Sequence, residues 1–318
     1  MSARRAASSA FRALSGSRAT TTRGRALATS PTDARASASA TPRVNTVDPR
    51  ETAKFEADAA LWWDEERGPF APLHAMNPVR CEFVRDVLVR HFRASPSEGR
   101  GRESPSHHAT HASARPLAGL RLLDVGCGGG ILCEALARMG ADVVGVDAAP
   151  ANVAVADAHA SLDPAVAART SYRAVPAETL LETGETFDAV LSLEVIEHVA
   201  DPEGFVRCLA GLARPGGAVI LSTINRTARA YAAAILAAER VAGWVPPGTH
   251  EFSKFITPEE LAALGARAGL ELREAAGMTY APPALGSRRG FITGGTWRLT
   301  GEDLGVNYLQ YFAKEGGR

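Results

Sequence analysis

Short apolar runs alternate with helically patterned segments along the chain after residue 120. The runs predict strands at Arg121–Val125, Asp142–Asp147, Thr170–Ala174, Phe187–Leu193, Ala218–Thr223, near Leu270–Met278 and near Thr296–Leu299. Helices are expected at about 130–139, 149–160 and 201–213 and from Thr257 onward. Elements that alternate in this way form a mostly parallel, doubly wound α/β sheet with helices on both faces. Ligands of such sheets bind at the carboxyl ends of the strands.

The chain before residue 120 has a different pattern. Residues 52–92 are expected to be helical, with a second helix from about Pro78 to Phe92. Residues 94–116 are rich in Ser, Pro, His and Gly, which predicts a flexible insertion. We therefore expect one folded domain over residues 45–318 that carries this insertion.

The first 44 residues have the composition of a targeting segment. They contain eight Arg, no Lys and a single acidic residue, Asp33. Arg4, Arg5 and Arg12 with Phe11 are spaced for a short cationic amphipathic helix, which is typical of an organellar transit peptide. The Arg spacing favours the mitochondrial matrix over the plastid. The alternative is a disordered tail that carries no address.

The charge balance argues against a nucleic-acid partner. The whole chain has 35 basic and 35 acidic residues, so the chain after the Arg-rich leader is acidic. Non-specific binding to nucleic acid needs a basic surface. The four cysteines include no C-x-x-C pair, which argues against a zinc site of the finger type. No uncharged apolar run approaches the roughly 18 residues of a membrane-spanning helix.

A glycine-rich turn follows the first strand of the α/β part. Gly126 and Gly128 belong to a G-x-G-x-G pattern, and Asp147 ends the second strand. Glycines allow a close approach of backbone to ligand, and a carboxylate in this place accepts hydrogen bonds from both hydroxyls of a ribose. Ile131 stands where the dinucleotide fingerprint requires another glycine. The pattern favours an adenosine-type cofactor without a pyrophosphate; the alternative is a tight structural turn with a surface Asp.

Two carboxylates and an imidazole follow the fourth strand. If a helical turn begins there, Glu194, Glu197 and His198 lie on one face of it. Such a set suits Mg²⁺, which would lower the pKa of a hydroxyl group bound to it. Alternatively, His198 acts without metal as a general base. A purely structural helix start is the third interpretation.

These segments resemble motifs of the class I S-adenosylmethionine-dependent methyltransferases. Besides the glycine turn and its following acid, Phe187-Asp188-Ala189-Val190 opens the fourth strand and Arg214-Pro215-Gly216-Gly217 precedes the fifth, as in that family. The resemblance implies a Rossmann-like fold with a mostly parallel seven-stranded sheet. It also implies S-adenosyl-L-methionine as the methyl donor.

The resemblance narrows to the ubiquinone biosynthesis O-methyltransferases and covers about residues 45–314. The insertion at 94–116 and the N-terminal extension are departures from that family's pattern. The segments that carry the resemblance are Val47-Asp48, Ala53-Lys54-Phe55-Glu56, Trp62-Trp63-Asp64, Pro72-Leu73-His74, Asn77-Pro78-Val79-Arg80, Asp124–Gly130, Leu193–Val199, Asn225-Arg226, Val245-Pro246, Gly248-Thr249-His250, Lys254-Phe255-Ile256 and Val306-Asn307-Tyr308.

The resemblance implies an activity and a set of site residues. The activity is two O-methylations of polyprenyl catechol intermediates. Mg²⁺ is implied at Glu194, Glu197 and His198, with His198 and Glu194 as catalytic residues. The implied cofactor contacts are Arg80, Gly126, Asp147 and Leu193, to which the turn adds Gly128. The guanidinium of Arg80 would bind the methionyl carboxylate by two parallel hydrogen bonds.

The segment 226–247 is predicted to be an inserted amphipathic helix. Its apolar and Arg side chains suit the surface of an anionic membrane, where a polyprenyl substrate resides. We expect a peripheral protein on the matrix side of the inner mitochondrial membrane, within a multi-enzyme complex of ubiquinone biosynthesis. The alternatives for this segment are a helix that covers the core and a dimer interface. The alternatives for the whole protein are a methyltransferase of a soluble phenol or amine and a non-catalytic scaffold that binds adenosylmethionine.

Overall fold

A computed structural model of the chain describes residues 46–94, 114–241, 243, 245–283 and 294–316. The predicted leader, 1–44, and nearly all of the predicted insertion, 94–116, lie outside the described residues. The unit that contains the site begins at Val44.

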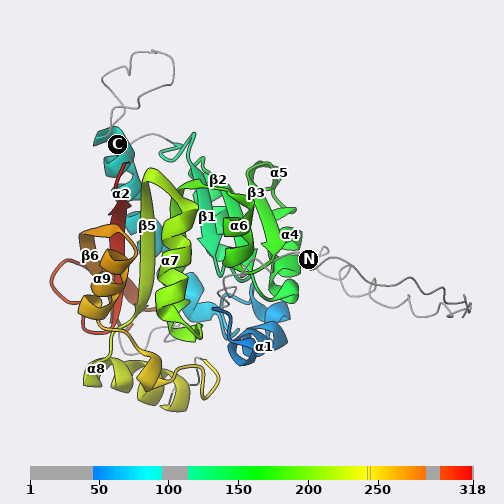
Figure 1. Cartoon of the computed structure of the whole chain (residues 1–318). Coiled ribbons are helices and arrows are strands. Elements are labelled where there is room, and N and C mark those ends of the chain that lie inside the picture. Colours follow the sequence, from blue (N-terminus) through cyan, green and yellow to red (C-terminus); the bar gives the residue numbers. More distant parts are fainter. Residues whose placement is uncertain (1–45, 95–113, 242, 244, 284–293, 317–318) are drawn as a thin grey trace, which may run out of the picture. The chain divides into compact units, whose positions relative to one another are not determined.

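One mixed sheet runs through this unit (Figure 1). Its strand order is β3-β2-β1-β4-β5-β8-β6-β7. The strands β1 to β5 pair in parallel with one another, whereas β8 pairs antiparallel with both β5 and β6, and β7 pairs antiparallel with β6. Their bounds are β1 Arg121–Val125, β2 Asp142–Asp147, β3 Thr170–Ala174, β4 Phe187–Leu193, β5 Ala213–Ile224, β6 Leu270–Ala281, β7 Thr296–Thr300 and β8 Asn307–Lys314.

The described sheet has eight strands, so the expectation of seven was wrong by one. The additional strand is β8, which lies between β5 and β6 and is buried over almost its whole length. A strand buried on both faces lacks the alternation that marks a half-exposed strand. Gln310 and Asn307 within it are buried polar residues, which weakened the apolar signal further.

The predicted helices begin close to the expected places, with one correction, whereas the helices at Pro164–Ala167 and Ala177–Thr183 were not predicted. The second helix of the N-terminal part begins at Ala71, before Pro78, and continues through it. Pro78 has no backbone N–H, so one hydrogen bond of the helix is missing there. Buried Met76 and Val79 on either side of Pro78 hold the helix against the core. The helices are α1 Pro49–Ala57, α2 Ala71–Ala94, α3 Ile131–Arg138, α4 Pro150–Ala160, α5 Pro164–Ala167, α6 Ala177–Thr183, α7 Pro202–Leu212, α8 Ala228–Ala230 and α9 Pro258–Arg267, with 3-10 helices η1 Ala59–Leu61, η2 Ile196–His198 and η4 Phe252–Lys254 and the π-helix η3 Tyr231–Val241.

Two apolar cores cover the two faces of the sheet. On one face, side chains of α2 and α3 pack against the strands, with fully buried Leu88 and Leu136. On the other face, α6, α7 and α9 contribute, with fully buried Leu209 and Leu261. The doubly wound arrangement that the sequence predicted is therefore confirmed.

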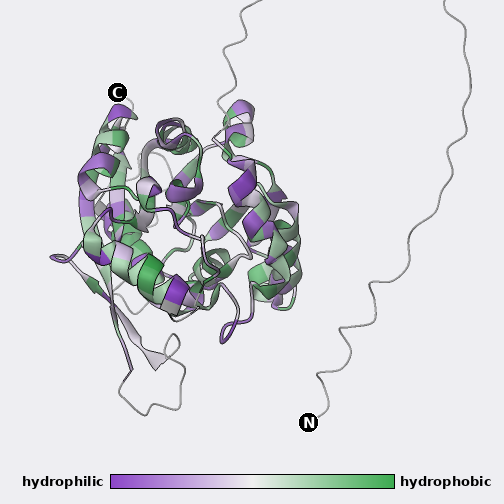
Figure 2. Cartoon of the chain, turned by 90° about the horizontal axis from the view of Figure 1, so that it is seen from below, coloured by the Kyte–Doolittle hydropathy of each residue, from purple (hydrophilic) through white to green (hydrophobic). Residues whose placement is uncertain are grey.

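The carboxyl ends of the parallel strands lie at one edge of the sheet, beneath which α1 and the segment from α8 to η3 are found (Figure 1). Viewed from that side, apolar and polar positions are interleaved along the helices (Figure 2). Within the described part of the chain, no helix combines the length and the apolar character needed to cross a bilayer.

Candidate active site

A cavity of about 850 Å³ opens at the carboxyl edge of the sheet. Its volume is in the range of small-molecule binding sites. The walls come from the strand ends, from α1 and from the π-helix η3, which contributes Ala233, Ala234 and Ala238. Of the residues predicted from the sequence, this cavity is lined by Gly126, Gly128, Asp147, Leu193, Glu194, Glu197 and His198.

The glycine turn has the close packing that requires glycine. Gly126 and Gly128 have φ values of 76° and 51°. A Cβ on Gly128 would lie 2.3 Å from the Trp62 ring, and one on Gly126 would lie 2.5 Å from Val195. Any other residue would therefore combine backbone strain with a steric clash.

Asp147 is held in place by three donors. Its Oδ2 accepts from the backbone N–H of Gly128 at 3.0 Å, and its Oδ1 accepts from that of Ala149 at 2.8 Å and from Asn152 at 3.3 Å. Burial raises the pKa of this carboxyl, while the backbone N–H donors oppose the rise. The carboxylate thus joins the glycine turn to the start of α4 at the cavity wall.

Arg80 is the predicted residue that does not line the cavity. Its side chain is buried, and its Nη2 donates to the carbonyl of Leu73 at 3.3 Å and to Asn77 at 3.1 Å. Its Nε has no hydrogen-bond partner. Burial lowers the pKa of Arg80, whereas the charges of Glu194 and Asp124 oppose that effect. An unpaired, buried guanidinium N–H is costly and suits a missing anionic partner.

Glu194 does not begin a helical turn, which corrects the expected geometry. Its φ is +59°, the one left-handed value of a non-glycine residue in the described ranges. The helical part is η2, a single 3-10 turn that starts only at Ile196. The expected single helix face for the three side chains is therefore wrong. Left-handed backbone at a cavity wall is strained and is held by its surroundings.

Those surroundings are hydrogen bonds to β5 and β8. The backbone N–H of Glu194 donates to Ser222 Oγ at 3.0 Å, and that hydroxyl donates back to Glu194 Oε1 at 2.7 Å. Asn307 donates to Oε2 at 3.0 Å. Burial raises the pKa of Glu194. Both carboxyl oxygens are thus engaged by neutral donors.

Glu197 is a second buried carboxyl at this wall. Its Oε2 accepts from Thr223 Oγ1 at 2.9 Å. Burial raises its pKa to about 7, and the neighbouring charge of Glu194 adds to the rise. The two carboxyls therefore oppose each other's ionisation.

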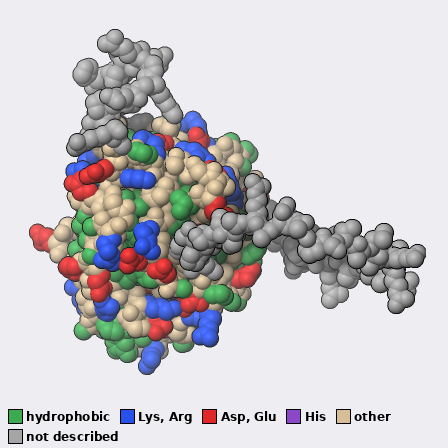
Figure 3. Space-filling model, viewed as in Figure 1, with side chains coloured by type: hydrophobic (Ala, Val, Ile, Leu, Met, Phe, Trp, Pro, Cys, Tyr) green, Lys and Arg blue, Asp and Glu red, His purple; other side chains and the backbone are tan. Residues whose placement is uncertain are grey.

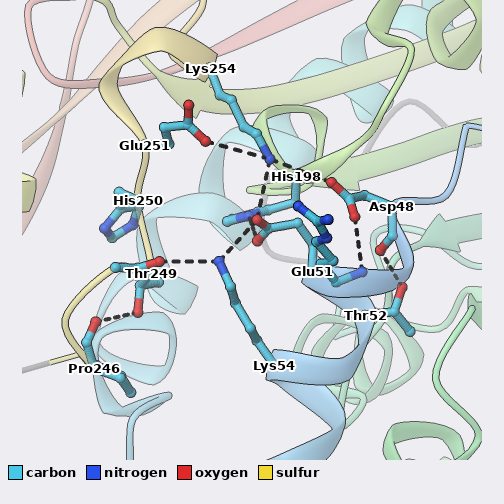
Figure 4. A network of polar contacts seen from close by, with 12 residues as sticks. Asp48, Glu51, Thr52, Lys54, His198, Pro246, Thr249, His250, Glu251 and Lys254 are labelled. Carbon is cyan, nitrogen blue, oxygen red and sulfur yellow. Dashed lines mark hydrogen bonds and ion pairs between the residues drawn. The ribbon is translucent and has the colours of Figure 1, made fainter.

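His198 forms a pair with Glu51 of α1, a residue that the sequence did not indicate. Its Nδ1 lies 3.0 Å from Glu51 Oε2 (Figure 4). The pKa of Glu51 falls to about 2, because His198 and then Lys54 and Lys254 hydrogen-bond its carboxylate. An ionised carboxylate only accepts, so Nδ1 of His198 is the donor. Glu51 lies 147 residues away in the chain, and no local pattern marked it.

The predicted magnesium ligands do not fit the ion in this arrangement. By chemical type, two carboxylates and an imidazole are suitable ligands for Mg²⁺. However, separate hydrogen bonds orient the three side chains, Glu194 toward Ser222 and Asn307, Glu197 toward Thr223 and His198 toward Glu51. Among the described residues, no three His, Cys, Asp or Glu side chains are grouped as metal ligands. The structure therefore does not support the predicted Mg²⁺.

Comparison with known proteins assigns the family. A family model described as a methyltransferase domain matches residues 93–275. The ubiquinone biosynthesis O-methyltransferase of Arabidopsis thaliana, named as mitochondrial, is 48% identical over 83% of this chain and 73% of that protein. The protein of the same name from Azorhizobium caulinodans is 49% identical over 83% of this chain and 92% of that protein. The chain belongs to the ubiquinone biosynthesis O-methyltransferases.

Two solved structures that resemble this O-methyltransferase are more distant than these sequence relatives. A magnesium protoporphyrin IX methyltransferase from Synechocystis is 16% identical with a TM-score of 0.49, over 86% of this chain and 100% of that one. A methyltransferase from Thermotoga maritima is 17% identical with a TM-score of 0.48, over 84% and 99%. The family assignment of this O-methyltransferase rests on its sequence relatives and not on these structures.

Proposed function

We propose that this O-methyltransferase transfers the methyl group of S-adenosyl-L-methionine to hydroxyls of polyprenyl catechol intermediates, at both O-methylation steps of ubiquinone biosynthesis. The observation that carries the proposal is the Glu51–His198 pair, which faces the same cavity as the Gly126 turn and Asp147. A proton acceptor and a candidate nucleoside site thus share one space.

The proposed cofactor site uses the residues at the ends of β1, β2 and β4. Asp147 accepts hydrogen bonds from the two ribose hydroxyls, and the Gly126 turn lets the backbone approach the ligand. Leu193 supplies an apolar wall. The unpaired Nε of Arg80 supports a role for this side chain with the methionyl carboxylate, although Arg80 lies behind the residues that line the cavity. When bound, the cofactor supplies an electrophilic methyl group on sulfonium sulfur.

His198 is the proposed base for the nucleophile. A phenolic hydroxyl has a pKa of about 10, so it needs a proton acceptor near neutral pH. Glu51 holds Nδ1 of His198 as the donor, which leaves Nε2 as the acceptor. The O–H proton passes to Nε2 as the phenolic oxygen forms its bond to the methyl carbon, and the carbon–sulfur bond breaks to leave S-adenosylhomocysteine. Buried Glu194 stabilises the imidazolium electrostatically.

Mg²⁺ remains the alternative way to activate the phenol. Activity in a chelator, with a metal-free enzyme, supports His198 acting as base. Loss of activity that added Mg²⁺ alone restores supports a rearrangement of Glu194 and Glu197 into ligands. The proton transfer to His198 and the methyl transfer do not use the ion.

We also propose that η3 contacts an anionic membrane. Leu236 on this helix is exposed, and Arg240 is exposed beside it. Figure 3 shows apolar and basic side chains at the lower end of the molecule, where this segment lies in Figure 1. Arg226 and Arg229 form ion pairs with Glu260 and Asp303, which argues against a contact of these two side chains with lipid headgroups. Peripheral attachment to the inner mitochondrial membrane, on the matrix side, and membership of a multi-enzyme complex complete the proposal.

Leu236→Asp tests the membrane contact. Flotation with cardiolipin-containing vesicles is expected to fall for this variant. The matched control is Leu162→Asp, because Leu162 is exposed on the turn after α4, far along the chain from η3. Equal binding of both variants and the unmodified protein would remove η3 as the contact.

The activity itself is tested by methyl transfer to a catechol with a long prenyl chain, with a short-chain catechol beside it. Product formation supports the proposal, and a preference for the long chain separates it from a methyltransferase of soluble phenols. If adenosylmethionine binds but no catechol is methylated, the scaffold interpretation holds instead.

A further inference from the structure

A second His–Glu pair lies beside the first. Nδ1 of His250 is 2.8 Å from Oε1 of Glu239, a residue of η3 that is only 4% exposed. The same carboxylate accepts from the backbone N–H of His250 at 2.8 Å and from that of Gly248 at 2.7 Å. The imidazole is thus fixed through both its ring and its backbone.

Both imidazoles face one space. His250 lines the main cavity together with His198, and the two also line a polar side cavity of about 260 Å³ with Glu51 and Glu197. Lys54 of α1 donates to the carbonyl of Gly248 at 3.2 Å, which ties the His250 loop to the helix that carries Glu51 (Figure 4). Each ring uses Nδ1 for its own glutamate, so each has Nε2 left for a ligand.

Two acceptor nitrogens in one cavity match the chemistry of a catechol, which has two hydroxyls on neighbouring carbons. One hydroxyl loses its proton as it is methylated. The other must find an acceptor when the ring enters the cavity, since an unpaired buried hydroxyl is costly. A methoxy or hydrogen substituent in its place has no proton to donate.

We propose that His250, oriented by Glu239, accepts a hydrogen bond from the neighbouring, non-reacting hydroxyl of the catechol. His250 is thereby a residue that determines specificity for vicinal hydroxyls, while His198 serves the reacting oxygen. This inference rests on the proposed function, and it assigns the inserted segment a part in substrate recognition.

The test compares two prenylated substrates: a catechol, and a matched phenol whose neighbouring hydroxyl is methylated. The unmodified enzyme is expected to prefer the catechol by roughly three- to tenfold in kcat/KM, as one hydrogen bond would give. His250→Gln is expected to raise KM for the catechol by a similar factor, with little change for the methylated phenol. The preference between the substrates therefore collapses.

His159→Gln is the matched control. Nδ1 of His159 also lies against a buried glutamate, Glu134, at 2.6 Å, but His159 does not line the cavity. This variant is expected to keep the preference. Glu239→Asn is expected to follow His250→Gln in direction, and binding of S-adenosylmethionine, measured by calorimetry, is expected to be retained in both.

Several results would overturn the inference. One is an unmodified enzyme that methylates both substrates equally; another is a His250→Gln enzyme that keeps its preference. An equal loss on both substrates would assign His250 a structural role instead. Because the glutamine side chain could itself accept the hydrogen bond, the ratio of kcat/KM for the two substrates is also measured for His250→Ala. If the unmodified enzyme methylates neither substrate, the proposed function fails rather than this inference alone.

Discussion

Glu51 Oε2 lies 3.0 Å from His198 Nδ1, although one residue belongs to α1 and the other to the 3-10 turn after β4. The contact joins the N-terminal helix to the end of the sheet. Lys54 and Lys254 bind the other oxygen of Glu51 at 3.0 and 3.2 Å, so the carboxylate is ionised and fixed. The orientation of His198 is therefore decided by a part of the chain that precedes the sheet.

Glu51→Gln is expected to lower kcat for catechol methylation. An amide in this place does not stabilise the imidazolium that forms on His198, and general-base catalysis contributes typically 10²–10⁴-fold. We expect a loss of roughly 10–100-fold, with the affinity for S-adenosylmethionine unchanged, in steady-state kinetics and calorimetry. Glu66→Gln, at an exposed site outside the cavity, serves as the control. An unchanged kcat in Glu51→Gln would exclude this role.

Asp147→Asn is expected to weaken the binding of S-adenosylmethionine. Hydrogen bonds to a charged acceptor contribute roughly 1.5–3 kcal/mol, so a neutral amide should raise Kd by about 10–100-fold. Titration calorimetry measures the effect, with Asp157→Asn on the exposed side of α4 as the control. Equal Kd values for the two variants would mean that Asp147 only closes the turn.

Gly128→Ala is expected to destabilise the protein through two effects. The left-handed backbone costs about 1–2 kcal/mol with a Cβ, and the contact with Trp62 at 2.3 Å adds an overpacking cost of about 1–3 kcal/mol. Gly184→Ala isolates the first effect, because its φ is 72° and its Cβ would meet nothing within 4 Å. Urea unfolding should therefore show the larger loss for Gly128→Ala, and equal losses would contradict the clash.

Asp124 is expected to make stability depend on pH. Burial raises its pKa to about 6 in the folded protein, against about 3.9 in an unfolded chain. Between these values the folded state binds more protons, so this residue's contribution to the free energy of unfolding falls as pH rises from about 4 to about 6. The total change is at most about 3 kcal/mol.

Asp124→Asn removes this term. The stability of the variant relative to the unmodified protein should increase from pH 4 to pH 7, as measured by urea unfolding at both values. Subtracting the free energy of unfolding of the unmodified protein from that of the variant cancels the contributions of other groups. Among these is Glu51, whose lowered pKa has the opposite effect on stability. A constant difference would show that the pKa of Asp124 is the same in the folded and the unfolded chain.

Local pattern was sufficient to predict much of the candidate site. Asp147 and Leu193 end their strands, and the glycine turn, Glu194, Glu197 and His198 follow theirs. Parallel strands bring their carboxyl ends to one edge of a sheet. Their common cavity follows from that topology. Short apolar runs likewise located all the parallel strands, although β5 begins at Ala213 and not at the predicted Ala218.

Tertiary packing decided the rest, because those features depend on contacts between segments far apart in the chain. Glu51 and Asn307 reach His198 and Glu194 from 147 and 113 residues away, and no local pattern indicates either contact, although Asn307 belongs to a segment that carries the family resemblance. The left-handed backbone of Glu194 depends on Ser222 of the neighbouring strand, which replaced the expected helical face. The sequence alone therefore determined which groups meet at the edge of the sheet. Only the packed fold decided how they are oriented, since orientation is set by hydrogen bonds from neighbouring elements.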